Sequence, residues 1–184
     1  NQARQYLASR NLGGTVPSVW KLGFAPGKRR LVTHLRSLGF TDGEMVEANV
    51  AVKSSNGIND RFFNRVMFPI MDINNKVIRL WWSCYGEGEP KYLNSLRHRF
   101  FEKNRNLYGM HVAKRNRKPY FLICEGYMDV ISLHQAGFTN AVASLGTAFT
   151  VQHGLLLKRY TKEVVLTFDS DGAGIKQHFV RYRF

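Results

Sequence analysis

Three acidic residues stand directly after apolar runs of the sequence, where polar side chains can do chemistry. Glu125 follows Tyr120–Cys124, and Asp169 and Asp171 follow Val164–Phe168. Two residues apart in extended chain, Asp169 and Asp171 point the same way with Cα atoms about 6.5 Å apart, so they can share a cation. Oxygen ligands without sulfur or imidazole select a hard ion, Mg²⁺ or Mn²⁺. The pattern predicts a metal site of Glu125, Asp169 and Asp171 that binds nucleotide or nucleic-acid phosphates for phosphoryl transfer.

Each acid also has a simpler interpretation when it is taken alone. Asp-x-Asp-Gly is typical of an exposed turn, and Asp169 with Asp171 also fits a phosphatase-type nucleophile and general acid. Glu125 can neutralise a helix N-terminus. A calcium loop is excluded because Ala173 and Val180 stand at its fifth and twelfth positions. The combination of three acids at predicted strand ends favours the metal site.

A sheet of parallel strands must position these acids. Apolar runs predict strands over Tyr120–Cys124, Ala141–Ala143 and Val164–Phe168, and helices are expected over Asp129–Ala136 and Val151–Tyr160. This alternation predicts right-handed crossovers and a parallel sheet buried on both faces. Ligands bind beyond the carboxyl ends of such strands, so the three acids are expected at one rim, within about 12 Å of one another.

The first half of the chain predicts helices followed by strands. Helices are expected over Ala3–Ala8, over a leucine-bearing segment at 31–38 that Gly39 ends, and directly after it, where Thr41 and Glu44 form the capping box of the next helix. An antiparallel meander is expected next. Its strands are Val50–Val52, Arg61–Ile70 and Lys76–Tyr85, with turns at Asn56-Gly57 and Asn74-Asn75.

A basic, helical stretch over about residues 97–118, closed by Pro119, is typical of a domain junction. We therefore expect two domains. Residues 1–117 form an α+β lobe of helices and an antiparallel meander, and residues 118–184 form an α/β subdomain with parallel strands.

The chain of 184 residues carries 27 Lys and Arg residues against 13 Asp and Glu residues, a formal net charge of +14. Such an excess favours a polyanionic partner, above all nucleic acid, because each neutralised phosphate releases counterions. Basic residues are interspersed with aromatic ones, which suits contacts to phosphate and stacking of unpaired bases, although many of the rings are expected in the core. The basic members are Arg61, Arg65, Lys91, Lys103 and Arg105, and the aromatic members are Phe62, Phe63, Trp81, Trp82 and Tyr92.

Several classes of protein are excluded. No run of about 18 apolar residues occurs and Asn1–Arg4 does not open a secretion signal, so a cytoplasmic protein without a membrane partner is expected. Two isolated cysteines, Cys84 and Cys124, exclude a disulfide scaffold and a Cys-x-x-Cys zinc site, and Cys124 is expected to be an inert buried thiol. The six histidines lack metal-ligand spacing, and no Walker-type phosphate loop is present.

Two sets of motifs carry a family resemblance. Three segments resemble the Toprim part of bacterial DnaG-type primases: Glu125–Val130, Ala141–Ala148 and Val164–Gly174. Four upstream blocks are similar, in the same order, to the amino-terminal lobe of the same polymerase core: Asp60–Phe62, Arg65–Ile70, Pro90–Ser95 and Leu107–Gly109. The resemblance covers nearly the whole chain, from about residue 3 to about residue 176.

The resemblance implies an RNA polymerase core that copies single-stranded DNA into short RNA primers during replication, using NTPs and Mg²⁺ or Mn²⁺. It places Glu125 at the catalytic centre, Asp129 as a supporting acid, and Asp169 and Asp171 as metal ligands. The residues that it implies for template or nucleotide binding are Arg61, Arg65, Lys91, Asn94 and Lys103. Full-length members are expected to have a replicative helicase and a single-strand-binding protein as partners.

Two other functions stay open beside this one. The first is a Toprim nuclease or topoisomerase-like strand transferase, and the second is a catalytically inactive DNA-binding fragment. Labelled DNA that is nicked in the presence of metal favours the first. Binding that weakens steeply with salt and ignores Mg²⁺ favours the second.

The chain also departs from the family pattern. Trp81-Trp82-Ser83 replaces the usual Gly-Gly-Arg, and Phe63 stands where a basic residue is common, so two charge contacts are expected to be lost. Residues 177–184 differ from the expected alanine-rich helix. No counterpart is seen for the zinc module, the helicase-binding region or the last strands and acidic cluster of Toprim, which predicts a truncated Toprim subdomain without zinc.

Overall fold

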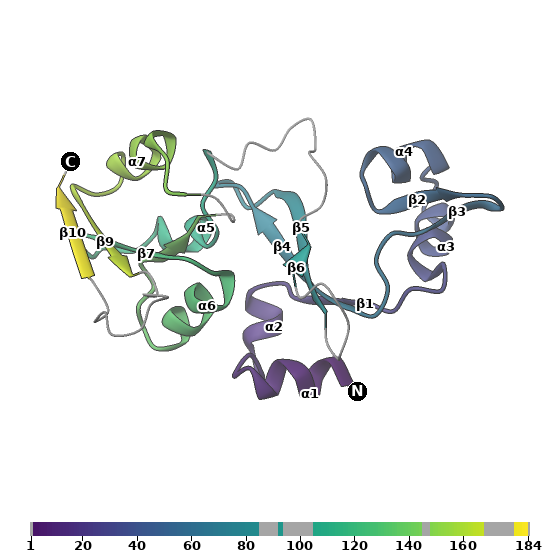
Figure 1. Ribbon diagram of the computed structural model, residues 1–184, viewed down its shortest axis with the longest axis horizontal. Coiled ribbons are helices and arrows are strands. Elements are labelled where there is room, and N and C mark those ends of the chain that lie inside the picture. The colour runs from purple at the N-terminus through teal and green to yellow at the C-terminus, as the bar shows by residue number, and fades with distance from the viewer. Residues whose placement is uncertain (1, 85–91, 94–104, 145–147, 168–178, 184) are drawn as a thin grey trace, which may run out of the picture. The chain divides into compact units, whose positions relative to one another are not determined.

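The computed structural model describes residues 2–84, 92–93, 105–144, 148–167 and 179–183 (Figure 1). The chain divides into two compact units. The amino-terminal unit comprises Asn1–Pro69 and Leu80–Arg99, and the carboxyl-terminal unit comprises Ile70–Arg79 and Phe100–Phe184. Neither unit is one continuous stretch of chain, and a functional boundary between residues 117 and 118 stays a prediction.

The amino-terminal unit begins with two helices and a short strand. These are α1 (Gln2–Ser9), α2 (Val16–Val19) and β1 (Gly23–Ala25). Leu7, Leu12 and Trp20 are buried and anchor this segment to the unit. The first helix confirms the expectation from the sequence, whereas β1 was not predicted, since a three-residue strand with Gly23 has no detectable period.

Two helices and a hairpin form a small core of their own. The elements are α3 (Arg30–Ser37), α4 (Asp42–Glu47), β2 (Ala51–Ser54) and β3 (Gly57–Asp60). Each contributes one buried side chain to a common cluster: Val32, Met45, Ala51 and Ile58. The helix expected over residues 31–38 ends one residue earlier than predicted, because α3 ends at Ser37. Leu38 follows it and is 60% exposed, so it does not join the apolar face of the helix.

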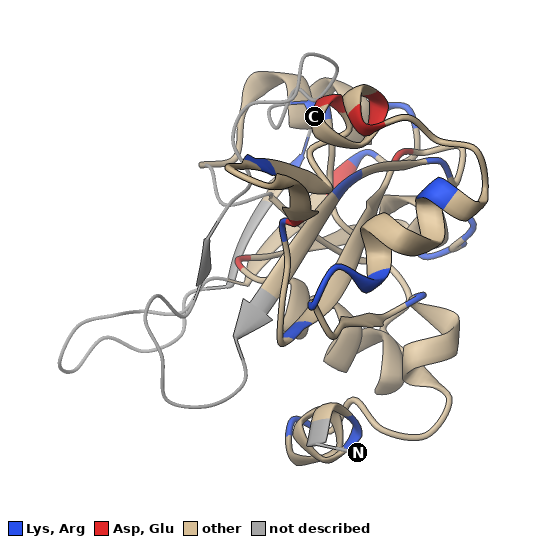
Figure 2. Cartoon of the chain, turned by 90° about the vertical axis from the view of Figure 1, so that its right-hand side faces the viewer, with Lys and Arg blue, Asp and Glu red and all other residues tan. Residues whose placement is uncertain are grey.

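Side-chain caps define the ends of these helices. The Thr41 Oγ1 accepts the Glu44 N–H at 3.3 Å, and the Glu44 carboxylate accepts the Thr41 N–H at 2.7 Å, which confirms the capping box. Gly39 has φ of 89°, the left-handed value expected after a helix. Figure 2 shows acidic residues gathered on α4, where Asp42 pairs with Arg36 of α3 at 2.7 Å.

The start of α3 is capped from a distance by a residue of β3. Asp60 accepts the N–H groups of Leu31 and Val32 at 3.2 and 2.9 Å. These are first-turn amides that a helix cannot pair internally, and a negative charge near them is favoured by the helix dipole. Asp60 therefore joins the hairpin to α3.

The remaining strands of this half form a separate four-stranded sheet in the order β1-β4-β5-β6. The new strands are β4 (Arg65–Met71), β5 (Val77–Cys84) and β6 (Tyr92–Leu93). The prediction of one continuous meander is wrong, because β2 pairs with β3 alone and the chain leaves the extended conformation between Asp60 and Arg65. Asn64 at φ of 51° interrupts the expected strand there.

Both predicted turns are present. Ser54 pairs with Gly57 across the β2–β3 turn, and Gly57 has φ of 102°. At the other turn, Asp72 Oδ1 accepts the N–H groups of Asn74 and Lys76 at 2.8 Å each. Short polar side chains thus satisfy the backbone where the chain reverses.

The carboxyl-terminal unit is built around a second four-stranded sheet, in the order β10-β9-β7-β8. Its strands are β7 (Phe121–Cys124), β8 (Ala141–Ala143), β9 (Glu163–Thr167) and β10 (Phe179–Arg183), and its helices are α5 (Met110–Ala113), α6 (Tyr127–Gln135) and α7 (Val151–Lys158). The strand β7 is parallel to β8 and β9, as expected, whereas β10 is antiparallel to β9 and was not predicted.

Helices cover both faces of the central strand. Figure 1 shows α6 on one face of β7 and α5 with α7 on the other. Ile123 packs with Met110 of α5 and Leu157 of α7 in one cluster. All residues of β7 and β8 are buried, which confirms a sheet covered on both faces at its centre. None of the described helices is long and apolar enough to cross a membrane.

Polar side chains tie the sheet connections to the strands. The Nε2 of His134, on α6, lies 2.9 Å from the carbonyl oxygen of Ala141, and Asn140 donates to the carbonyl of Tyr120 at 2.9 Å. The side chain of His134 is half-buried, and this burial lowers its pKa from the usual 6.5, against a smaller opposing effect of the Ala141 carbonyl.

The cap on α3 predicts a loss of stability in Asp60→Ala. Removing the carboxylate leaves two helix amides without their partner, so the free energy of unfolding should fall by about 1–2 kcal/mol. Urea denaturation measures this loss, and faster hydrogen exchange at the Leu31 and Val32 amides localises it. The exposed acid Glu47 provides the control, since Glu47→Gln should change stability by less than about 0.5 kcal/mol. Unchanged exchange at both amides would contradict the cap.

The burial of His134 predicts that acid destabilises the carboxyl-terminal unit. Its pKa is lower in the folded protein than in the unfolded chain, so the unfolded chain binds the proton more readily. The contribution is therefore complete above pH 6.5, the unfolded value, and is lost as the pH falls below it. Urea midpoints measured between pH 7.5 and pH 5 (roughly the span in which histidine titrates) should fall less in His134→Gln than in the wild type. Parallel pH profiles for the two proteins would rule this out.

Candidate active site

The carboxyl ends of three parallel strands lie at one level. Cys124, the last residue of β7, is in register with Ala143 at the end of β8 and with Thr167 at the end of β9. The chain that leaves β7 begins with Glu125. This rim is the position where ligands bind in sheets of this kind.

Glu125 is an exposed carboxylate beside a cavity of this rim. Within the part of the chain that the structure describes, it has no hydrogen-bond or ion-pair partner. The cavity has a volume of about 420 Å³. Its lining consists of Cys124, Glu125, Asp129, Ser132, Leu133, Ala136 and Thr167. No described residue therefore competes with a ligand for this carboxylate.

Asp129, in contrast, has a structural partner. Its Oδ2 accepts the Gly126 N–H at 3.0 Å, at the start of α6. A Cβ on Gly126 would lie 2.9 Å from the same oxygen, so glycine leaves the space that this contact needs. Asp129 thereby holds the turn that presents Glu125.

The last residues of β7 and β9 are uncharged, and Cys124 is buried whereas Thr167 is half-buried. Thr167 donates its hydroxyl to the carbonyl of Ile123 at 3.1 Å, with Cys124 Sγ at 3.5 Å. The Cys124 side chain is 1% exposed, and burial raises the pKa of its thiol to about 11, with a further rise from the charge of Asp129. This confirms the prediction of an unreactive thiol.

Two tyrosines near the strand ends pack inward. The rings of Tyr127 and Tyr108 meet edge to face at 4.8 Å, and both side chains are buried. Burial raises the pKa of Tyr127 to about 12, and it also raises the pKa of Tyr108 above its usual range. Neither ring offers the exposed hydroxyl that a strand transferase needs as its nucleophile.

Several predicted site residues lie outside the described residues: Asp169, Asp171, Lys91, Asn94 and Lys103. Among the residues that are described, no group of three or more His, Cys, Asp or Glu side chains could hold a metal ion. A metal site that uses Glu125 therefore needs ligands from outside the described residues.

The two predicted basic residues that are described belong to the amino-terminal unit. Arg61 follows β3 and is half-buried, and its guanidinium has no hydrogen-bond or ion-pair partner in the described part of the chain. Arg65 begins β4, and its guanidinium lies 5.6 Å from the ring centre of Phe63.

The tryptophans that depart from the family pattern are core residues. Trp81 packs on Phe68 with ring centres 4.8 Å apart, and Trp82 packs on Phe62 at 4.7 Å. Both indoles are less than one-tenth exposed. They supply packing where the family pattern would place glycines.

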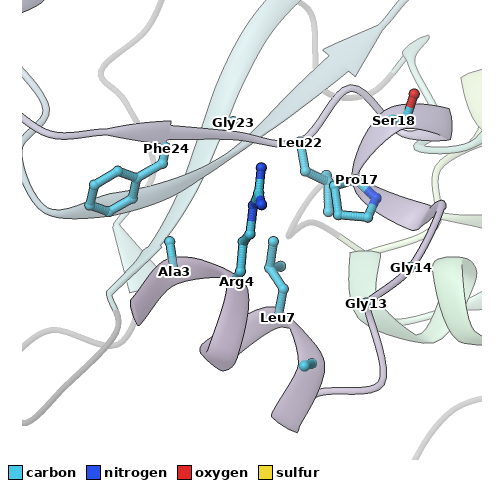
Figure 3. Close-up of a pocket in the computed structure, with 11 residues that line it drawn as sticks. Ala3, Arg4, Leu7, Gly13, Gly14, Pro17, Ser18, Leu22, Gly23 and Phe24 are labelled. Atoms are coloured by element: carbon cyan, nitrogen blue, oxygen red, sulfur yellow. The ribbon is translucent and has the colours of Figure 1, made fainter. Parts of the chain in front are cut away.

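A second cavity lies between α1, α2 and β1 in the amino-terminal unit, with a volume of about 630 Å³ (Figure 3). Arg4 extends from α1 towards Leu22 and Gly23, and Leu7 and Pro17 form an apolar wall. None of the predicted site residues lines this cavity.

Sequence reasoning missed two residues that shape these regions. Asp60 appeared only as part of a family block, although it caps α3 across 28 residues of chain. Thr167 appeared only as an apolar-run residue, although its hydroxyl bridges β9 to β7. A polar residue at the last position of an otherwise apolar strand was the available signal for Thr167.

Comparisons with known proteins agree with this arrangement. Residues 1–114 match the family model described as the DNA primase catalytic core, N-terminal domain, and residues 122–179 match a Toprim-like model. A DNA primase of Clostridium acetobutylicum is 42% identical over 176 residues, which cover 95% of this chain and 30% of the relative. The chain thus spans about 30% of the length of that curated relative.

Solved structures show the same fold. The structure of a DnaG primase catalytic domain bound to single-stranded DNA has a TM-score of 0.80 and 40% identity, covering 94% of this chain and 57% of that one. The Aquifex aeolicus primase, with its zinc-binding and RNA polymerase domains, has a TM-score of 0.86 and 33% identity, covering 95% and 44%. Since the primase model alone matches more than half of its length, the chain belongs to the family of DNA primase catalytic cores.

Proposed function

We propose that the chain carries the nucleotidyl-transfer centre of a DNA primase, which joins ribonucleotides into short primers on a single-stranded DNA template. The observation that carries this proposal is that Cys124 and Thr167, the last residues of β7 and β9, pair in register. Glu125 directly follows Cys124, and Asp169 stands two residues after Thr167 in the sequence. Both acids are therefore expected at the same rim of the sheet. Membership of the primase family supports the reaction.

Glu125, Asp169 and Asp171 are proposed to hold Mg²⁺ or Mn²⁺ at this rim. The donor set fits a hard ion, because the carboxylate oxygens of Glu125 have no partner among the described residues and the neighbouring Cys124 sulfur is buried. Two residues of chain span at most about 7 Å, which keeps Asp169 within reach of the end of β9. A bound divalent ion supplies positive charge to the phosphates of the incoming nucleotide.

The other residues are proposed to position the reactants. Asp129 acts as the supporting acid by holding the Gly126 turn, and so fixes the direction of Glu125. Arg61 and Arg65 contact the template or the nucleotide through their guanidinium groups, as do Lys91, Asn94 and Lys103. The net charge of +14 favours phosphate contacts that weaken with salt. A replicative helicase and a single-strand-binding protein are proposed only as partners of the longer primase in a cytoplasmic replisome.

Removal of the Glu125 charge tests the centre. Wild-type protein with Mg²⁺ or Mn²⁺, NTPs and a single-stranded template should make short RNA, seen on a denaturing gel. Glu125→Gln and Asp169→Asn should each lower this synthesis at least about 100-fold, as expected for loss of a charge-stabilising group. With Fe²⁺ in place of Mg²⁺, peroxide should cleave the wild-type backbone beside residue 125, and less so in both variants.

The exposed acid Glu47 on α4 supplies the matched control, and Glu47→Gln should keep both primer synthesis and iron cleavage. Equal cleavage and equal synthesis in Glu125→Gln and the wild type would overturn the centre. Nicked DNA without RNA product would favour the nuclease alternative. DNA binding that weakens with salt, with neither RNA synthesis nor nicked DNA, would favour the catalytically inactive DNA-binding fragment.

The cap formed by Asp129 predicts a stability effect that does not depend on catalysis. Asp129→Ala leaves the Gly126 amide unpaired and should lower the free energy of unfolding by about 1 kcal/mol, whereas Asp129→Asn keeps an oxygen acceptor and should lose less. Urea titration gives the two losses, and hydrogen exchange at Gly126 locates them. A stability of Asp129→Ala equal to that of the wild type would argue against the cap.

A further inference from the structure

Phe62 and Phe63 are neighbours in sequence with opposite environments. Phe62 is 6% exposed and packs against Trp82 in a cluster with Met67. Phe63 is 61% exposed. The Phe63 ring is therefore accessible to a ligand, whereas the Phe62 ring is not.

The base of the Phe63 side chain is held firmly. A Cβ placed on Gly27 would lie 2.4 Å from the Phe63 Cβ and 3.1 Å from its Cα, so the two backbones touch. Gly27 has φ of 74°, and Asn64, the residue after Phe63, has φ of 51°. With the buried Phe62 on one side and this loop on the other, the backbone that carries the ring is closely packed, so binding need not order the backbone at this position.

The surroundings of the ring are positively charged. The guanidinium of Arg65 lies 5.6 Å from the ring centre, and Arg61 is two residues away in sequence. The acid nearest in sequence, Asp60, is engaged by two amides of α3. An exposed ring beside cations is the combination that binds single-stranded nucleic acid, with the base on the ring and the phosphates on the cations.

We propose that Phe63 is a stacking platform for an unpaired base of single-stranded nucleic acid, and that Arg65 contacts the adjoining phosphate. The inference deepens the proposed function, on which it rests, by naming the side chain that binds a template base. The two contributions to binding can be measured separately, because the Phe63 ring stacks on the base whereas the Arg65 guanidinium contacts the nucleic-acid backbone.

Two oligonucleotides of equal charge test the platform. One is an oligothymidylate with a fluorescent end, and the other is the same backbone with abasic sites. Phe63→Leu should weaken binding of the oligothymidylate at least about fivefold while leaving the abasic strand unchanged. Phe63→Trp should bind the oligothymidylate at least as tightly as the wild type, because a larger ring stacks more strongly. Fluorescence anisotropy gives the affinities.

Phe40 supplies a matched control, because it is an exposed phenylalanine of the same unit at 49% exposure. Phe40→Leu should not change either affinity. Three results would each overturn the platform. Phe63→Leu could lose the same affinity for both strands, it could lose affinity for neither, or Phe40→Leu could lose as much affinity as Phe63→Leu. If the wild type makes primers and Phe63→Leu binds oligothymidylate like the wild type, the platform alone is wrong. If the wild type binds neither strand, both the platform and the proposed function are wrong.

Discussion

The pairing of β7 with both of its parallel neighbours is the constraint on which the candidate site depends. It sets Cys124 level with Ala143 and Thr167, so three chain segments leave the sheet at one rim. Both faces of β7 are buried, so a slip of one residue would force each side chain into the packing of the opposite face, where its shape does not fit. The position of Glu125 is therefore determined by burial of the strand before it, although Glu125 itself is exposed.

Most of the described acids have structural partners, whereas Glu125 and Glu47 have none among the described residues. Asp60, Glu44 and Asp129 each accept backbone N–H groups at or near a helix start, where charge and unpaired amides are complementary. Glu125 makes no such contact. What distinguishes Glu125 from Glu47 is its position, since Glu125 directly follows a buried strand of the parallel sheet and lines a cavity there.

The aromatic residues show a similar division for a different reason. Phe62, Trp81 and Trp82 pack in the core of the amino-terminal unit, and the two tryptophans occupy positions at which the family pattern has glycines. Phe63 alone of this group is exposed and lies beside a guanidinium. The same composition of rings and cations thus contributes both a core and a candidate surface for unpaired bases.

The sequence by itself determined the strand–helix alternation of the carboxyl-terminal half, the capping box at Thr41 and the turn at Asn74–Asn75, because these features depend on residues close together in the chain. Tertiary structure alone decided that β2 and β3 separate from the main sheet, that β10 joins β9, and that Asp60 caps α3. It also decided which of two adjacent phenylalanines is buried. Such outcomes rest on contacts between distant segments, whose burial and pairing free energies override local pattern.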